Sequence, residues 1–166
     1  LAQSQHPNRL ILAGTVQEEV GLRGAKTAAN FVKPDVAIIL ECPPADDSPG
    51  LPYSECQGKL GGGVQIRLFD PSAIAHPRLA RLAIQTAKAE GIPCQVTVRR
   101  SGGTDAGSFH LANDGIPCIV LGAPARYIHS HNSILDLNDY LHMVSLAIAL
   151  VRRLDEETVN GLVKYI

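Results

Sequence analysis

The run Val36-Ala37-Ile38-Ile39-Leu40 constrains the fold more than any other part of this sequence, because it contains no polar residue. A strand that is apolar on both faces is typical of a parallel sheet covered by helices on each side. The sequence therefore predicts a strand over Val36–Cys42, with a helical layer above it and another below it.

The rest of the chain alternates between strand-like and helix-like patterns. Further strands are predicted at Arg9–Val16, Val64–Phe69, Cys94–Arg100 and Ile116–Leu121. Helices are predicted at Leu22–Val32, Pro77–Glu90, Leu137–Leu154 and from the glycine-rich turn at Ser101–Asp105 to about Asn113. This order predicts an α/β fold, a three-layer α/β/α sandwich with a mixed, mostly parallel sheet.

Two of the strands alternate between apolar and polar residues. In Val64–Phe69 the residues Val64, Ile66 and Leu68 are expected to face inward, with Gln65 and Arg67 on the other face. This alternation predicts a half-buried strand. In Cys94–Arg100 the residues Val96 and Val98 alternate with Gln95, Thr97 and Arg99 in the same way.

The segment between the second and third predicted strands is rich in turn-forming residues. It runs from Pro43 to Gly63 and contains Pro43, Pro44, Pro49 and Pro52. Loops of this length inside a compact domain are usually functional or mobile.

Charge and composition narrow the class of protein. The chain has 166 residues, enough for one domain with a substantial core, and a formal net charge of −1 without a long basic run. We therefore expect neither nucleic acid nor an anionic membrane as a partner. No apolar run is long enough to span a bilayer, and the first residues do not resemble a signal peptide. The four cysteines form no CxxC pair, which favours reduced thiols in a cytoplasmic protein.

Two adjacent carboxylates, Glu18 and Glu19, lie between the first predicted strand and the first predicted helix. The carboxyl edge of an open α/β sheet is where such folds place their chemistry. One carboxylate can bind a metal there while its neighbour acts as a general base. The alternative from the residues alone is a solvated pair that complements the dipole of the following helix.

Other polar residues follow the later strands. Glu41 ends the apolar strand, and it is either a metal ligand or one partner of an ion pair. His129 and His131 lie in an irregular segment and are competing candidates for a histidine ligand. Asp105 opens a predicted helix, and we interpret it as an N-cap or near-cap residue rather than a ligand.

Four stretches, in this order along the chain, resemble the TET-type glutamyl and deblocking aminopeptidases, a family of co-catalytic dinuclear metallopeptidases. They are Thr15–Ala25 (TVQEEVGLRGA), Pro34–Glu41, Gly102–Gly107 (GGTDAG) and Pro124–Ser130 (PARYIHS). The likeness covers nearly the whole chain. It implies a metal-dependent aminopeptidase that hydrolyses the amino-terminal residue of oligopeptides by a metal-activated water.

The resemblance also implies a role for each candidate residue. Glu18 corresponds to the general base, Glu19 to a ligand of one metal ion and His129 to the family's ligating histidine. Glu41 corresponds to an acidic ligand of the other ion, where the family usually has aspartate. The two ions are expected to be zinc or cobalt, since carboxylate and imidazole donors suit both.

The same resemblance implies that residues 1–166 form the carboxy-terminal portion of a catalytic domain. A further histidine and a bridging aspartate are expected from a segment before Leu1, and nothing here corresponds to the family's inserted β-rich dimerisation domain. We therefore expect a sandwich that is incomplete on its amino-terminal side, and a homo-oligomer in the complete enzyme. Two alternatives remain: an inactive fragment or assembly and peptide-binding subunit, and another hydrolase on this scaffold, such as a deacylase or carboxypeptidase.

Overall fold

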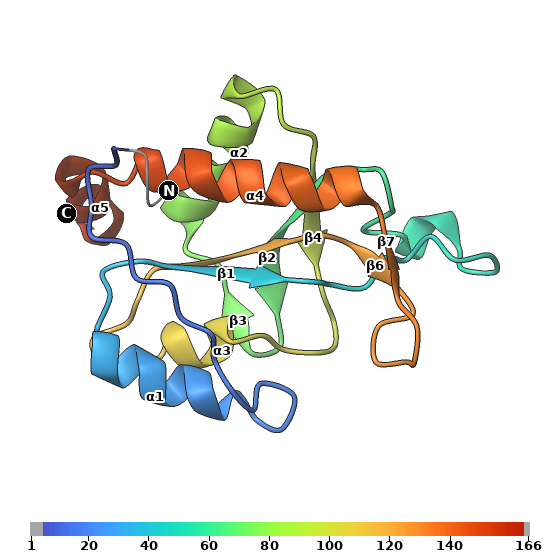
Figure 1. The fold of residues 1–166 in the computed structure, drawn as a ribbon, viewed down its shortest axis with the longest axis horizontal. Coiled ribbons are helices and arrows are strands. Elements are labelled where there is room, and N and C mark those ends of the chain that lie inside the picture. Colours follow the sequence, from blue (N-terminus) through green and yellow to red (C-terminus); the bar gives the residue numbers. More distant parts are fainter. Residues whose placement is uncertain (1–4, 165–166) are drawn as a thin grey trace.

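The computed structural model describes residues 5–164 and shows a sheet between two helical layers (Figure 1). The strands are β1 (Ala37–Glu41), β2 (Val64–Asp70), β3 (Ala73–Ile74), β4 (Cys94–Val98), β5 (Cys118–Gly122), β6 (Ala125–Arg126) and β7 (Ile134–Leu135). The helices are α1 (Arg23–Val32), α2 (Pro77–Ala89), α3 (Ala106–Phe109), α4 (Leu137–Arg152) and α5 (Glu156–Val163), with a short 3-10 helix, η1, at Tyr53–Glu55.

The main sheet is mixed, as the sequence predicts. Its order is β1-β5-β2-β3, and β4 also pairs with β2. The ladders β1–β5 and β2–β4 are parallel, whereas β2 runs antiparallel to β5 and to β3. The strands β6 and β7 form a separate antiparallel pair next to the carboxyl end of β5.

One face of the sheet is covered by α2 and α4, which lie on the same side of it in Figure 1. The core on this face is large and aliphatic. It includes Ile66 and Leu121 from the sheet, Leu79 from α2 and Leu146 and Leu150 from α4, all fully buried. This is the packing expected of a strand pair that is apolar on the helix-facing side.

The opposite face is covered by α1 and α3, and its core is built from smaller side chains. Ala29 of α1 and Ala106 of α3 pack against Ile39 of β1 and Val120 of β5. Small residues let these helices approach the sheet closely. The three-layer α/β/α sandwich predicted from the sequence is therefore confirmed.

The strand predicted over Arg9–Val16 is not formed. This segment is extended but unpaired, and Ile11, Leu12 and Val16 are exposed. It is held at its start by Asn8, whose Nδ2 donates to the carbonyl of Val151 at 2.6 Å. An apolar run indicates a tendency to be buried, but a strand also needs a hydrogen-bonding neighbour, and none of the described strands pairs with this segment.

The burial of the two alternating strands also differs from the prediction. On β2 the polar residues Gln65 and Arg67 are buried along with the apolar ones, so both faces of this strand are covered. On β4 Thr97 is buried, as is Arg99 directly after the strand, while Val96 and Val98 are about half exposed.

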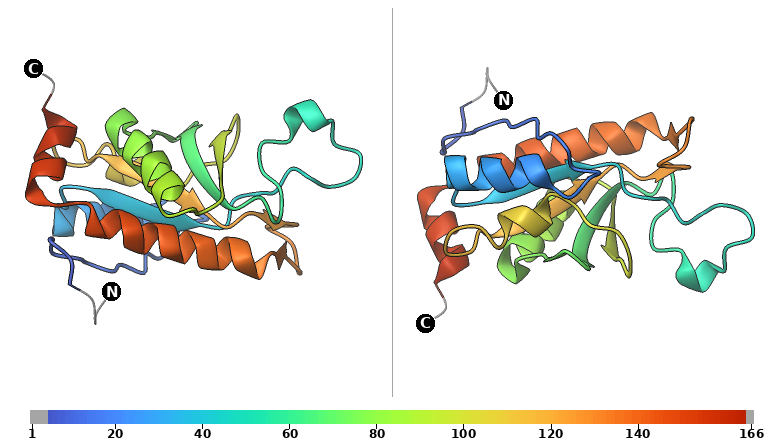
Figure 2. Two further views of the ribbon diagram at one scale, coloured as in Figure 1. Left: turned by 90° about the horizontal axis from the view of Figure 1, so that it is seen from above. Right: turned by 90° about the horizontal axis from the view of Figure 1, so that it is seen from below.

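The reason is the Pro43–Gly63 loop, whose first residues fold back over the sheet and supply hydrogen-bond acceptors. The carbonyl of Pro44 accepts from Gln65 at 3.1 Å, and Asp46 forms a salt bridge with Arg99 at 2.5 Å. Beyond these contacts the loop, including η1, projects from one end of the sandwich (Figure 2).

The helix predicted to run to about Asn113 is shorter in the structure. It ends at Phe109, and a turn follows in which Asn113 has a left-handed φ of 52°. A residue in that conformation does not continue an α-helix. All four cysteines are free thiols. Within residues 5–164, no helix has the length and apolar character to cross a membrane.

Candidate functional site

The candidate site lies at the carboxyl ends of β1 and β5. Glu41 is the last residue of β1 and stands opposite Gly122 of β5 in the parallel ladder. Beyond this point the two chains stay together, because the Ala125 amide donates to the carbonyl of Pro43 at 2.9 Å and the Ala45 amide donates to Ala125 at 2.8 Å. This pairing carries the following loop, which contains His129, to the same end of the sheet as Glu41.

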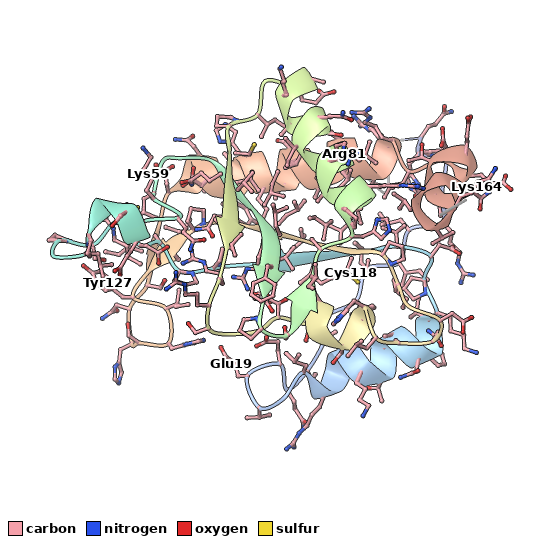
Figure 3. All side chains as sticks on the ribbon, turned by 180° about the vertical axis from the view of Figure 1, so that it is seen from behind. Glu19, Lys59, Arg81, Cys118, Tyr127 and Lys164 are labelled. Carbon is pink, nitrogen blue, oxygen red and sulfur yellow. The ribbon has the colours of Figure 1, made fainter. Side chains whose placement is uncertain are left out.

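The carboxylates Glu18 and Glu19 come from the loop that precedes α1. The carbonyl of Glu18 accepts from the amide of Leu22 at 3.0 Å, and the amide of Gly24 donates to the carbonyl of Val16 at 2.9 Å, so the chain folds back on itself around the two acids. A side chain at Gly24 would collide with the Val16 backbone at 2.4 Å, which explains glycine there. Figure 3 shows Glu19 on this loop.

Glu19 and His129 are in direct contact. The His129 Nε2 lies 3.1 Å from Oε1 of Glu19, although the two residues are 110 positions apart. Both side chains are about two-thirds exposed, so an ion pair here contributes little to stability. The contact therefore contributes little to holding the fold together.

Glu18 and Glu41 influence one another electrostatically. Burial raises the pKa of Glu41 to about 7, helped by the charge of Glu18 and opposed by Arg67. Burial also raises the pKa of Glu18, followed by repulsion from Asp105 and Glu19, while His129 lowers it. Several carboxylates thus share one partly desolvated region, which is how proteins prepare a site for a cation or for proton transfer.

The backbone on both sides of the site is held in uncommon conformations. Gln17, next to Glu18, has a φ of 60°, and Tyr127 and His129 have φ values of 60° and 59°. Left-handed geometry costs a non-glycine residue on the order of 1–3 kcal/mol and persists only where the surroundings impose it. Such residues cluster at functional sites, and here they flank the predicted base and the predicted histidine ligand.

The structure brings the four predicted site residues to one end of the sheet as two pairs. Glu19 contacts His129, and Glu18 is electrostatically coupled to Glu41. Across residues 5–164, no three histidine, cysteine, aspartate or glutamate side chains converge as a ligand set for one ion. His131 is exposed on the same loop as His129. His110 makes a local contact, from its Nδ1 to the carbonyl of Ala106 at 2.9 Å.

Asp105 belongs to this region, and it stands at the predicted N-cap position of α3. Its side chain accepts no hydrogen bond from the amides of α3. Instead, one carboxylate oxygen accepts from Oγ1 of Thr15 at 2.5 Å, just before the Glu18–Glu19 loop. The sequence signal was present in the GGTDAG motif, but a short acidic side chain before a helix is so often a cap that spacing alone does not reveal the longer-range partner.

With this geometry in view, comparisons with known proteins identify the family. Residues 1–146 match the M42 glutamyl aminopeptidases. The glutamyl aminopeptidase of Lactococcus lactis subsp. cremoris is 39% identical over 165 residues, which are 99% of this chain and 45% of that protein.

Solved structures agree with the sequence comparison. A TET aminopeptidase from a marine sediment archaeon of the Thaumarchaeota has a TM-score of 0.88 and 45% identity, covering 90% of this chain and 42% of that one. A TET peptidase of Pyrococcus horikoshii, which can assemble into a tetrahedron or a large octahedral shell, has a TM-score of 0.66 and 38% identity over 84% of this chain and 40% of that one. The chain thus spans about half the length of these relatives. It belongs to the M42 glutamyl aminopeptidase family.

Proposed function

We propose that this chain is the carboxy-terminal portion of the catalytic domain of a metal-dependent aminopeptidase that removes the amino-terminal residue of oligopeptides. The observation that carries the proposal is the contact between Glu19 and His129 at 3.1 Å. The charge of Glu18, the neighbour of Glu19, also acts on Glu41. Membership of a family whose relatives are named aminopeptidases supports the reaction class.

The donors at this site fit divalent metal ions. The contact between Glu19 and His129 presents an oxygen and a nitrogen to the same point, and Glu41 is a crowded carboxylate whose pKa is raised to about 7. A cation would relieve that crowding, because it favours the ionised form of each acid. We propose Glu19 and His129 as ligands of one zinc or cobalt ion and Glu41 as a ligand of a second. Bound there, the ions would supply Lewis-acid polarisation of the scissile carbonyl.

Glu18 is the proposed general base. It accepts a proton from the attacking water, whose oxygen bonds to the carbonyl carbon, and it returns the proton to the leaving amine as the C–N bond breaks. The raised pKa of Glu18, caused first by burial and then by Asp105 and Glu19, suits this role. A base is most effective when its pKa approaches the working pH.

The length comparison supports a role for residues outside this chain. The chain covers 45% of the Lactococcus enzyme, and the described residues form no three-ligand set. We propose that the full-length enzyme supplies the remaining ligands, a histidine and a bridging aspartate, and that it is a cytoplasmic homo-oligomer. The shells formed by the Pyrococcus horikoshii relative support the oligomer, and the four free thiols support the compartment.

Two oligopeptides of one sequence, one with a free amino terminus and one acetylated, test the reaction in the full-length enzyme. We expect release of the first residue from the free peptide alone. Equal hydrolysis of the acetylated peptide would favour the other hydrolases on this scaffold, and no hydrolysis of either would favour an assembly or peptide-binding subunit.

A further inference from the structure

The Thr15–Leu22 loop, which we call the acidic loop, carries Glu18 and Glu19 but is poorly supported by packing. Val16 and Val20 are 65% and 59% exposed, so the loop is not anchored in either core. Its backbone is hydrogen-bonded within the loop and to the first turn of α1, where the amides of Arg23 and Gly24 donate to the carbonyls of Gln17 and Val16. None of these bonds fixes the loop to the sheet. A catalytic base must nevertheless be held within a fraction of an ångström of its working position.

Helix α3 and the residue before it contact the acidic loop at both of its ends. At the first end, Oγ1 of Thr15 donates to Oδ2 of Asp105 at 2.5 Å. At the second end, Oγ of Ser108 donates to the carbonyl of Leu22 at 3.1 Å. Asp105 and Ser108 are three positions apart and therefore lie on the same side of one helical turn.

The position of α3 is itself fixed against the turn between β2 and β3. The amide of Thr104 donates to Oγ of Ser72 at 3.2 Å, and that hydroxyl donates to Asp70 at 2.6 Å. Gly107 packs so closely that an added Cβ would lie 2.7 Å from the Cβ of Ser72 and 3.1 Å from Cδ1 of Leu22. The GGTDAG motif therefore contacts the β2–β3 turn on one side and the acidic loop on the other.

Burying the carboxylate of Asp105 lowers the free energy of unfolding. The residue is 7% exposed, one oxygen is bonded to Thr15, and the other is buried without a hydrogen-bond partner among the described residues. A buried charge with one satisfied oxygen costs stability, and such a cost is usually tied to a functional role. Fixing the acidic loop is a role that this geometry supplies.

We infer that Asp105 and Ser108 form a two-point clamp that positions the acidic loop, and through it Glu18 and Glu19, relative to Glu41 and His129. The catalytic consequence of the clamp rests on the proposed function. Asp105 and Ser108 are positioning residues, since they contact the loop and not the reacting atoms. Removing either contact leaves the fold intact and loosens the loop.

Amide hydrogen exchange in the full-length enzyme tests the clamp without using activity. In Thr15→Val and Ser108→Ala we expect faster exchange confined to residues 16–22. Thr15→Ser keeps the hydroxyl and should exchange like the unmodified enzyme. Thr27→Val is the matched control, because Thr27 is hydrogen-bonded only within α1, to the carbonyls of Arg23 and Gly24. Unchanged exchange in Thr15→Val, or a rise spread over the whole chain, would overturn the inference.

Turnover then measures the consequence of a loosened loop. Thr15→Val should lower kcat by about 10- to 100-fold with KM nearly unchanged, since misplacement on the order of 1 Å can cost that much. Thr15→Ser should restore most of the rate. The double variant Thr15→Val with Asp105→Ala should lose no more than Asp105→Ala alone, because Asp105→Ala already removes the contact with Thr15 as well as the charge that acts on Glu18.

The same kinetics separate failure of the clamp from failure of the proposed function. A Glu18→Gln variant with near-normal turnover would refute the proposed base whatever the clamp does. If Glu18→Gln abolishes turnover while Thr15→Val, or the double variant, retains full kcat, the clamp alone is refuted.

Discussion

Glu18 and Glu41 lie at the same end of the sheet, yet one is carried by a loop and the other by a strand. Glu41 is the last residue of a strand whose ladder with β5 fixes every backbone atom around it. Glu18 lies on a loop with two exposed valines and a left-handed Gln17, held by hydrogen bonds from Thr15 and Ser108. The strand fixes the backbone of one acid, whereas the position of the other depends on a loop held by a few hydrogen bonds.

The largest expected effect concerns the residue on the loop. In the full-length enzyme Glu18→Gln should keep its metal and lose turnover by about 10²–10⁴-fold, the usual contribution of a general base. Glu19→Gln, one position along, should instead lower metal content. Metal analysis by mass spectrometry and a peptide-hydrolysis assay measure the two results.

Glu90→Gln is a suitable control for both substitutions, because Glu90 is an exposed residue at the end of α2, on the other face of the sheet. Equal metal loss in the Glu18 and Glu19 variants would contradict the division of roles between them.

The second effect concerns the residue on the strand. Glu41→Ala should release one metal ion per chain, whereas Glu41→Asp should stay active because it keeps a carboxylate at this position. Metal content and kcat of the two variants check this prediction. Full metal content in Glu41→Ala would mean that another residue, such as Asp47 or His131, does the coordinating.

The fold was more predictable from the sequence than the site was. Continuous and alternating apolar runs predicted β1, β2, β4, β5 and three of the helices, because apolar residue types indicate which positions are buried. The run Leu10–Ala13 is equally apolar, but no described strand lies beside it. Residue type alone does not predict whether a segment has a strand to pair with. The burial of Gln65 on β2 and of Arg99 after β4 was not predictable either. Both side chains donate to the carbonyl of Pro44, in a loop that begins some twenty residues before Gln65.

The candidate site shows the same limit. Glu18, Glu19, Glu41 and His129 were predicted as site residues through motifs, and the structure places them at one end of the sheet. Asp105 and Thr15 were not predicted as a pair, because their contact spans 90 positions and each has a common local role. Local sequence patterns predict hydrogen-bond partners that are near in the sequence. The contacts of Asp105 and Ser108 with the acidic loop depend instead on how α3 packs against the sheet.

A smaller effect follows from the raised pKa of Glu41 and applies to the metal-free protein. The ionised form is disfavoured in the folded state, so the free energy of unfolding is highest below about pH 4.5 as far as this group is concerned, and it falls as pH rises through about 7. The loss should be on the order of 1–2 kcal/mol, because the half-buried side chain is partly screened by solvent.

Chemical denaturation between pH 4.5 and 8 measures this slope. Glu41→Gln should flatten it, and metal should reverse it, since a cation favours the ionised carboxylate. A slope that is unchanged in Glu41→Gln would show that another group titrates in this range.

The most direct test of the account is the metal content and activity of the isolated 166-residue chain. With Glu18 reserved as the base, Glu19, Glu41 and His129 leave three ligands for a site that needs two ions and a bridge between them. We predict at most one divalent ion per chain by mass spectrometry and no appreciable release of amino-terminal residues from peptides. Two tightly held ions per chain, together with turnover, would contradict it and would show that residues within the chain complete the site.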